Sequence, residues 1–192
     1  PYTTLFRSGY GWQVSAGSGI SRCRKTVAHD GQAAPIRWLS DDALCLSGQR
    51  LSRYKVNGVI QSHQFTTQVQ SNILVITGHG YSSSKAGYSY FTAESKDGSI
   101  NYYGNSTDAQ LLGDGNLVYR WALNRVEDSV GNAVVYRYLG ANGTDFRLDT
   151  IEYALNSQGV AAAEVSFDYT PRLDVQANYV AGVKYIMNQR LS

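Results

Sequence analysis

The sequence is poor in the features that mark several large classes of protein. It has 192 residues with only three prolines, one methionine and two cysteines, and its formal net charge is only +2. A charge so close to balance provides no overall field for nucleic acid or for an anionic membrane surface. Its apolar runs, such as residues 73–76, fall far short of the roughly 18 residues that a membrane-spanning helix needs. The sequence therefore predicts neither nucleic-acid binding nor a membrane span.

Cysteine and histidine are too sparse to predict a metal site or a disulfide scaffold. Cys23 and Cys45 lack the close spacing of thiolate metal ligands. A single bridge between them stays open, but two free thiols packed as small apolar side chains is the favoured interpretation. His29, His63 and His79 are far apart and have no neighbouring ligand at metal-binding spacing. No metal and no cofactor is therefore predicted.

The motifs of the common catalytic sites are also missing. No serine lies in a G-x-S-x-G turn, and residues 78–85 contain glycines and a lysine without the spacing of a phosphate-binding loop. Asp41 and Asp42 are adjacent, so on extended chain they point to opposite faces and cannot act on one substrate. Both are interpreted as solvated turn acids. The sequence predicts no catalytic residue and a protein that is not an enzyme.

Tyrosine and glycine are abundant instead, with 15 and 19 copies, as is typical of strands joined by tight turns. Residues 116–138 alternate between apolar and polar positions on both sides of Gly131-Asn132, which predicts a hairpin. Residues 163–170 form the most regular alternation in the chain, and Pro171 is expected to end that strand.

Two further segments repeat this pattern. Residues 88–103 are expected to turn at Gly98, and residues 151–169 are expected to turn at Gly159. Helix-forming segments are nearly absent, and residues 66–76 are as compatible with a strand as with a helix because they are rich in β-branched residues. The sequence therefore predicts an all-β fold class, built of antiparallel hairpins that form a curved sheet.

Aromatic side chains and turn glycines are the residues expected to hold this sheet together. The expected structural anchors are Trp12, Trp38, Trp121, Phe167 and Tyr169. The expected turn glycines are Gly98, Gly131 and Gly159, of which the first two should take positive φ. Residues 78–87 are small and polar, which predicts an exposed loop.

The first eight residues are identical to the translation of a widely used sequencing adapter. Residues 1–8 are therefore expected to be an artefact rather than native sequence. Residues 9–192 are expected to form a single β domain that is truncated at both ends, and the chain is expected to be a fragment of a larger protein.

Several segments resemble one known family in the order and spacing of their residues. The segments are residues 9–12, 18–23, 30–31 and 41–51, then 91–105 with Lys96-Asp97-Gly98, then 121–138 with Gly131-Asn132, and finally 167–191 with Phe167-Asp168-Tyr169. Together they resemble the N-terminal region shared by SpvB-type plasmid virulence proteins and the B components of insecticidal toxin complexes. Residues 60–87 match this pattern least well.

The resemblance implies a structural role in a secreted bacterial toxin. In toxin-complex B components the related region contributes to a hollow β-shell with Rhs/YD-type repeats, which encloses a toxic C-terminal segment until delivery. The implied partners are the rest of the chain and other toxin-complex subunits.

Two alternatives remain open. In SpvB-type proteins a similar region precedes an ADP-ribosyltransferase, so the chain could be a delivery or secretion domain. The Glu-x-Glu pair of that transferase is absent, since the glutamates are Glu94, Glu127, Glu152 and Glu164. A carbohydrate-binding or adhesive β module is the other alternative, suggested by tyrosines such as Tyr81 and Tyr88 that are expected to be exposed.

Overall fold

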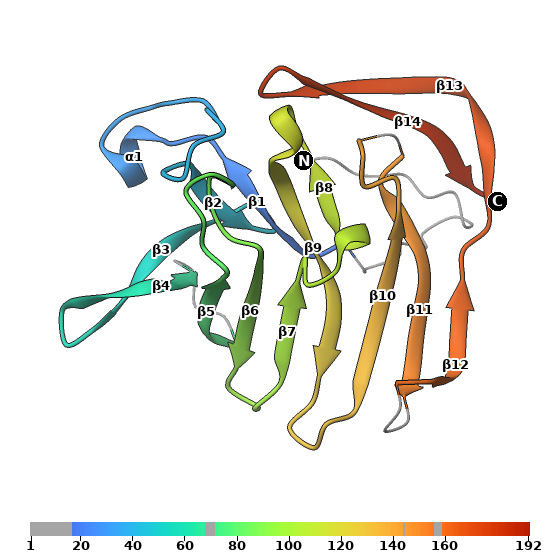
Figure 1. The fold of residues 1–192 in the computed structure, drawn as a ribbon, viewed down its shortest axis with the longest axis horizontal. Coiled ribbons are helices and arrows are strands. Elements are labelled where there is room, and N and C mark those ends of the chain that lie inside the picture. The colour runs from blue at the N-terminus through green and yellow to red at the C-terminus, as the bar shows by residue number, and fades with distance from the viewer. Residues whose placement is uncertain (1–16, 68–71, 144, 156–158) are drawn as a thin grey trace.

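A computed structural model describes residues 17–67, 72–143, 145–155 and 159–192, and strands dominate it (Figure 1). The strands are β1 (Gly19–Cys23), β2 (Ala43–Leu46), β3 (Gln49–Val56), β4 (Val59–Thr67), β5 (Ile73–His79), β6 (Tyr90–Ser95), β7 (Ile100–Tyr103), β8 (Gln110–Leu112), β9 (Val118–Glu127), β10 (Ala133–Leu139), β11 (Arg147–Leu155), β12 (Ala161–Ser166), β13 (Tyr169–Val180) and β14 (Val183–Leu191). Within these described ranges, helical structure is confined to α1 (Val27–Asp30) and the 3-10 turns η1 (Thr107–Ala109) and η2 (Asp114–Asn116). The predicted all-β fold class of antiparallel hairpins is confirmed.

The main sheet closes on itself through β9. Strands β1 to β7 pair with their neighbours in chain order, β7 pairs with β9, and β9 pairs back to β1. We call this closed circuit of β1–β7 and β9 the ring. The β1–β9 contact aligns Ile20 with Trp121 and Ser21 with Arg120. Closure removes the free edges that an open sheet would present.

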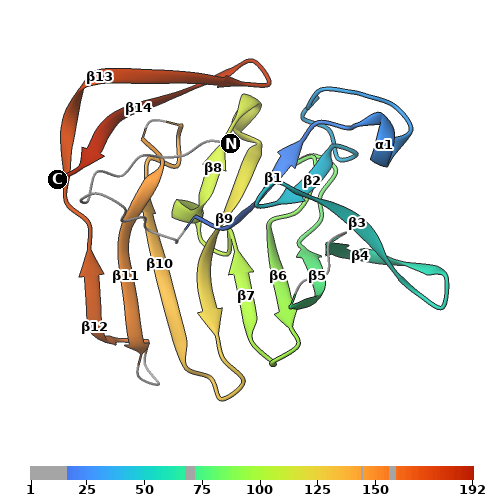
Figure 2. The ribbon, with the colours of Figure 1, turned by 180° about the vertical axis from the view of Figure 1, so that it is seen from behind.

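Strand β9 belongs to two structures at once. Its N-terminal half pairs with β1 and β8, whereas its C-terminal half pairs with β7 and β10. From β10 the sheet continues through β11 to β12, outside the ring (Figure 2). We call β10–β14 the extension. No helix in the described part of the chain is long and apolar enough to cross a membrane.

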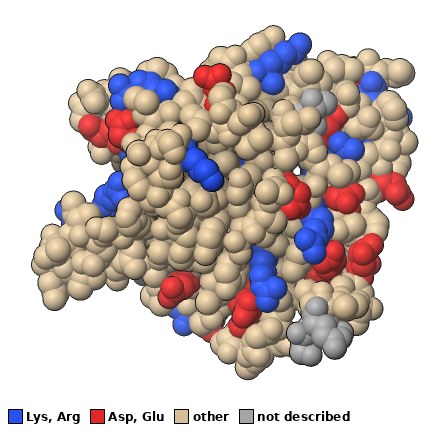
Figure 3. All heavy atoms as spheres, in the orientation of Figure 1, with Lys and Arg blue, Asp and Glu red and all other residues tan. Residues whose placement is uncertain are grey.

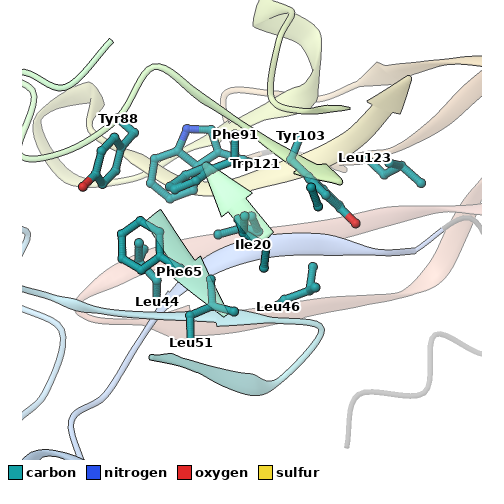
Figure 4. Packing of buried hydrophobic residues seen from close by; sticks show 12 residues of the cluster. Ile20, Leu44, Leu46, Leu51, Phe65, Tyr88, Phe91, Tyr103, Trp121 and Leu123 are labelled. Carbon is teal, nitrogen blue, oxygen red and sulfur yellow. The ribbon is translucent and has the colours of Figure 1, made fainter. Parts of the chain in front are cut away.

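The main hydrophobic core fills the ring. Trp121, Phe91, Ile20 and Ile76 are its largest fully buried side chains. The rings of Phe91 and Trp121 meet edge to face, with centroids 5.1 Å apart (Figure 4), a geometry that adds to the stabilisation from buried area. The ring is therefore a packed body.

A second, smaller core lies against the other face of β9. Because side chains alternate across a strand, Ala122 points away from the core that holds Trp121. It packs with Ala109, Tyr138 and Leu148. The Tyr138 hydroxyl donates to the Leu123 carbonyl at 2.6 Å, which satisfies its polar group inside this cluster.

Three hairpins lie where the sequence predicts them. Strands β6 and β7 are joined through Gly98, β9 and β10 through Gly131, and β11 and β12 through Gly159. These glycines have φ of 82°, 91° and 78°, which L side chains adopt with difficulty. In the β9–β10 turn, Asp128 Oδ1 accepts hydrogen bonds from the backbone N–H groups of Val130 and Asn132.

Pro171 does not end a strand, so that prediction is wrong. Strand β12 ends at Ser166, and Pro171 lies near the start of β13, opposite Gln189 of β14. Strands β13 and β14 form a separate two-stranded sheet, which we call the ribbon. An outer strand of this kind leaves N–H positions unpaired, so proline fits there without breaking a ladder. Figures 1 and 2 show the ribbon across one end of the neighbouring strands.

The interpretation of Cys23 and Cys45 as free thiols is also wrong. Their sulfur atoms form a disulfide, with the Cα atoms 6.0 Å apart. The reason is the antiparallel pairing of β1 with β2, which places Ser21 opposite Cys45 and Cys23 opposite Ala43. The spacing of the two cysteines in the sequence does not predict this bridge, because no tight turn joins β1 and β2 into a local hairpin.

Residues 78–87 are only partly the predicted exposed loop. Gly78 and His79 complete β5, whereas Gly80 and Tyr81 and then Ser83 to Lys85 are exposed. Ala86 and Gly87 are buried. Tyr88, which follows them, is also buried, at 7% exposed, so the expectation that it is exposed is wrong. The second half of the loop turns inward because its backbone accepts a hydrogen bond from a buried arginine.

Candidate functional site around Arg22

The buried arginine is Arg22, on the same face of β1 as Ile20. It is 3% exposed and lies at the end of the ring core. Its Nε donates to the Val118 carbonyl, Nη1 to the Leu39 carbonyl and Nη2 to the Ala86 carbonyl, each at 2.8 Å. One side chain thus ties together β1, the first residue of β9 and two loops.

Asp42 completes this arrangement. Its Oδ2 accepts from Arg22 Nη1 at 3.1 Å, and both side chains are 2% exposed. The same carboxylate accepts from the backbone N–H groups of Arg37 and Leu39. Burial lowers the pKa of the Arg22 guanidinium, and the Asp42 charge opposes that shift. We call Arg22, Asp42 and the three accepting carbonyls the Arg22 junction.

The guanidinium of the Arg22 junction is engaged with groups of the protein itself. All three guanidinium nitrogens already donate to protein acceptors. The rings of Trp38 and Trp121 lie 6.0 and 5.9 Å from the guanidinium carbon, within cation–π range. No group of three or more histidine, cysteine, aspartate or glutamate residues that could hold a metal occurs among the described residues.

An open groove lies next to the Arg22 junction. Its volume is about 380 Å³. It is lined by Ser40, Arg53, Ile60, Gln61, Ser62, His63, Tyr81 and Tyr88. Ser40 and Tyr88 also line the small cavity beside Arg22. The loops that Arg22 fixes therefore form one wall of the groove, and the β3–β4 hairpin forms the other.

A bulge in β4 directs His63 into this groove. Arg53 of β3 pairs with Phe65 of β4, and Lys55 of β3 pairs with Ile60 of β4. More residues of β4 than of β3 lie between these two pairs, and the extra residues form the bulge. His63 sits in this bulge with φ of 62°, a strained conformation for a non-glycine residue. Its Nδ1 lies 3.1 Å from the Tyr88 hydroxyl, at hydrogen-bond distance.

The structure places the expected anchors in different environments. Trp121 is in the ring core, with Nε1 donating to the Ser89 carbonyl at 3.2 Å. Trp38 is half-buried, and its Nε1 donates to the Ala181 carbonyl of the ribbon turn at 3.2 Å. Phe167 packs against the second core. The Tyr169 hydroxyl donates to the Leu148 carbonyl.

Trp12 and residues 1–8 lie outside the described residues.

The interpretation of Asp41 and Asp42 as solvated turn acids holds for one of them only. The Asp41 side chain is 54% exposed, whereas that of Asp42 is 2% exposed. The two side chains point in different directions, as expected for adjacent residues. The Asp41 side chain points to solvent, whereas the Asp42 side chain points into the protein and contacts Arg22. Nothing local in the sequence pairs residues 22 and 42, so the Arg22 junction was not predicted.

Charged side chains are distributed without one dominant sign. Figure 3 shows lysine and arginine interspersed with aspartate and glutamate over the face in view. This distribution fits the small net charge of the chain.

Comparison with known proteins identifies the family. Residues 8–185 match the model of the family described as Salmonella virulence plasmid 65kDa B protein, SpvB. The chain belongs to the SpvB family. The SpvB match covers the ring and most of the extension, and it agrees with the family that the sequence motifs resemble. No curated protein matches the chain.

Solved structures share the fold of this SpvB family member. The N-terminal domain of effector protein SpvB from Salmonella typhimurium strain LT2 matches with a TM-score of 0.69 and 14% identity, over 99% of this chain and 78% of that chain. The TcdB2-TccC3-Cdc42 crystal structure matches with a TM-score of 0.66 and 14% identity, over 91% of this chain and 11% of that chain. The Photorhabdus luminescens Tc holotoxin pore matches with a TM-score of 0.64 and 13% identity, over 92% of this chain and 11% of that chain.

At this identity the likeness establishes the fold. The chain spans about a tenth of the length of the Tc toxin chains that it matches. The family membership itself follows from the SpvB model over residues 8–185, and the effector domain and the Tc toxin structures share its fold.

Proposed function

We propose that this chain is a non-enzymatic structural segment of a secreted bacterial toxin or virulence protein, contributing to a β-shell that encloses and delivers a C-terminal toxin. The observation that carries the proposal is the shared fold with both an effector's N-terminal domain and Tc toxin components over at least nine-tenths of this chain. The partners would be the rest of the same toxin chain and other toxin-complex subunits.

The use of buried polar groups supports a structural role. The most deeply buried ion pair, Arg22 with Asp42, is fully engaged in joining segments of the fold. A catalytic site would instead direct such groups at a substrate.

Exposed apolar side chains of the ribbon support contact with further protein. Leu173, Val175 and Tyr179 are 105%, 59% and 68% exposed. Neighbouring exposed apolar side chains of this kind mark interaction surfaces. In a shell they would be covered by adjoining hairpins of the Rhs/YD type.

The disulfide supports export. A Cys23–Cys45 bridge persists in an oxidising compartment and is uncommon in the bacterial cytosol. Secretion would place the protein in such an environment.

A delivery or secretion domain in front of an ADP-ribosyltransferase is the alternative, because the chain also matches the N-terminal domain of an effector. The two roles differ in what happens to the C-terminal part of the parent protein. A shell shields that part, whereas a delivery domain leaves it accessible.

Limited proteolysis of the intact parent protein tests the proposal. If the chain helps to form a shell, the C-terminal segment resists protease in the native protein and becomes sensitive when Trp121→Ala opens the ring. The matched control is Tyr179→Ala, which removes an exposed aromatic ring. Equal sensitivity in the native protein and in Trp121→Ala would contradict the shell, and loss of export with an accessible C-terminal segment would favour the delivery domain.

A further inference from the structure

We propose that the groove between the β3–β4 hairpin and the loop after β5 binds a saccharide that carries a carboxylate. The inference rests on the side chains that line the groove and is independent of the shell role. Its volume of about 380 Å³ lies in the range of small-ligand sites, roughly 300–1,000 Å³. Its lining combines an aromatic platform, a cation and several hydroxyl or amide groups.

Tyr81 provides the platform. It is 46% exposed, and its ring packs against those of His63 and Tyr88, with the centroids 5.3 Å apart in each case. A pyranose presents C–H groups on one face and hydroxyls around its edge. A fixed and partly exposed phenol ring suits such a ligand, because it offers apolar area together with a polar tip.

Arg53 provides the positive charge. Its guanidinium lies over the Phe65 ring, with the carbon 4.8 Å from the centroid. Stacking on an aromatic face leaves the in-plane N–H groups of arginine available, and they match a carboxylate in pairs. Arg53 takes part in none of the ion pairs within residues 17–67, 72–143, 145–155 and 159–192. Among the residues that the structure describes, no aspartate or glutamate lines the groove, so its electrostatics favour an anion.

The remaining polar groups suit hydroxyls of the ligand. Ser40, on the side of the loops that Arg22 fixes, and Ser62, on the β3–β4 hairpin, are lining residues that carry hydroxyl groups. The Gln61 amide nitrogen donates to the Val59 carbonyl at 3.1 Å, which orients the side chain. A single anchoring cation among neutral donors and acceptors fits one acidic sugar better than a polyanion, which would need several cations.

The groove is preorganised. The Arg22 junction fixes the Ala86 backbone, and Tyr88 follows two residues later with its hydroxyl against His63. His63 in turn keeps its strained backbone, with φ of 62°, within the β4 bulge. Strain of this kind persists where surrounding structure holds it, and it occurs at binding sites. A site that is already ordered loses less entropy on binding.

Titration calorimetry of the complete 192-residue chain tests this assignment with two matched probes. Methyl glucuronide carries the carboxylate, and methyl glucoside is its neutral counterpart. We expect saturable binding of the glucuronide, and binding of the glucoside that is weaker by roughly tenfold or more, because one charge-assisted contact is lost. The glucuronide affinity should fall as salt is added.

Three variants then locate the site. Tyr81→Ala should weaken glucuronide binding about tenfold through loss of the aromatic contact, whereas Tyr81→Phe should retain it. Arg53→Gln should abolish the preference for glucuronide over glucoside. Tyr179→Ala, an exposed tyrosine of the ribbon, is the matched control and should bind as the native chain does. Circular dichroism of each variant verifies that the fold is intact.

Several results would overturn the proposal. These are no saturable binding of the glucuronide, equal binding of both probes, or losses in Tyr81→Ala and Arg53→Gln no larger than that in Tyr179→Ala. Binding of an extended acidic peptide in place of the sugar, with the same dependence on Arg53, would identify the groove as a peptide site and would also overturn it.

Discussion

The ring and the extension follow the same strand pattern but stabilise it differently. In the ring, Trp121, Phe91, Ile20 and Ile76 are at most 1% exposed, and the sheet has closed its own edges. In the extension, β11 is the one partner of β12 among the strands that the structure describes, and the ribbon exposes large apolar side chains. The ring therefore contains most of the stabilising burial. The extension presents exposed apolar side chains instead, which fits the proposed contact with other protein.

The largest expected difference between the two regions comes from core truncation. Trp121→Ala removes the centre of the ring core and its hydrogen bond to Ser89. The free energy of unfolding should fall by about 3–5 kcal/mol, measured by urea denaturation. Tyr179→Ala in the ribbon removes an exposed ring and should change stability by less than about 0.5 kcal/mol. Similar losses in both variants would remove the distinction between ring and extension.

Ion pairs provide a second comparison. Arg22→Met in the ring leaves the Asp42 carboxylate buried and unpaired, which should cost about 3–5 kcal/mol of unfolding free energy. In the ribbon, the Asp174 side chain of the Arg172–Asp174 pair is 74% exposed. The matched Arg172→Met variant should show little change in its urea midpoint, since exposed pairs contribute little. A stable Arg22→Met variant would contradict the role given to the Arg22 junction.

The disulfide is a third element that stabilises the ring. The bridge links residues that are 22 positions apart in the sequence. Reduction increases the conformational entropy of the unfolded chain, which should lower the free energy of unfolding by about 3 kcal/mol. Dithiothreitol should therefore lower the urea midpoint of the native chain. The Cys23→Ser/Cys45→Ser double variant should unfold at that lower urea midpoint both with and without dithiothreitol. Coincident midpoints for all samples would disprove the bridge.

The smallest expected effect is a dependence on acid. The hydrogen bond from Arg50 holds the pKa of Asp30 below its usual value in the folded chain. Because the charged form favours folding, this contribution is present at neutral pH and is lost as pH falls below the ordinary value of about 4. The Asp30→Asn variant should therefore lose less stability than the native chain as the pH is lowered, as measured by denaturation at a series of pH values. The Asp174→Asn variant in the ribbon should change this pH dependence of stability less, because the Arg172–Asp174 ion pair is exposed.

Local patterns predicted the hairpins but not the features that close the ring. The turns at Gly98, Gly131 and Gly159 are encoded by neighbouring residues, since alternation and a glycine suffice for a hairpin. Pairing of Ile20 with Trp121 joins distant parts of the chain, and no local pattern specifies it.

The candidate site was predicted less completely than the fold. Arg22 meets Asp42, and Cys23 meets Cys45, only because β1 and its neighbours are assembled in space. The same holds for the groove. Tyr81 was expected to be exposed and is, but the bulge that brings His63 beside it depends on the register of β3 and β4.

The double use of β9 has a consequence for how the molecule opens. Its N-terminal half lies between β1 and β8, and its C-terminal half lies between β7 and β10. Detaching β10 would strip hydrogen bonds from a strand that also closes the ring. Amides of β9 should therefore exchange with deuterium only through global unfolding, as one foldon that includes both regions. Amides of β12 and the ribbon, which lack this shared strand, should exchange earlier through local opening.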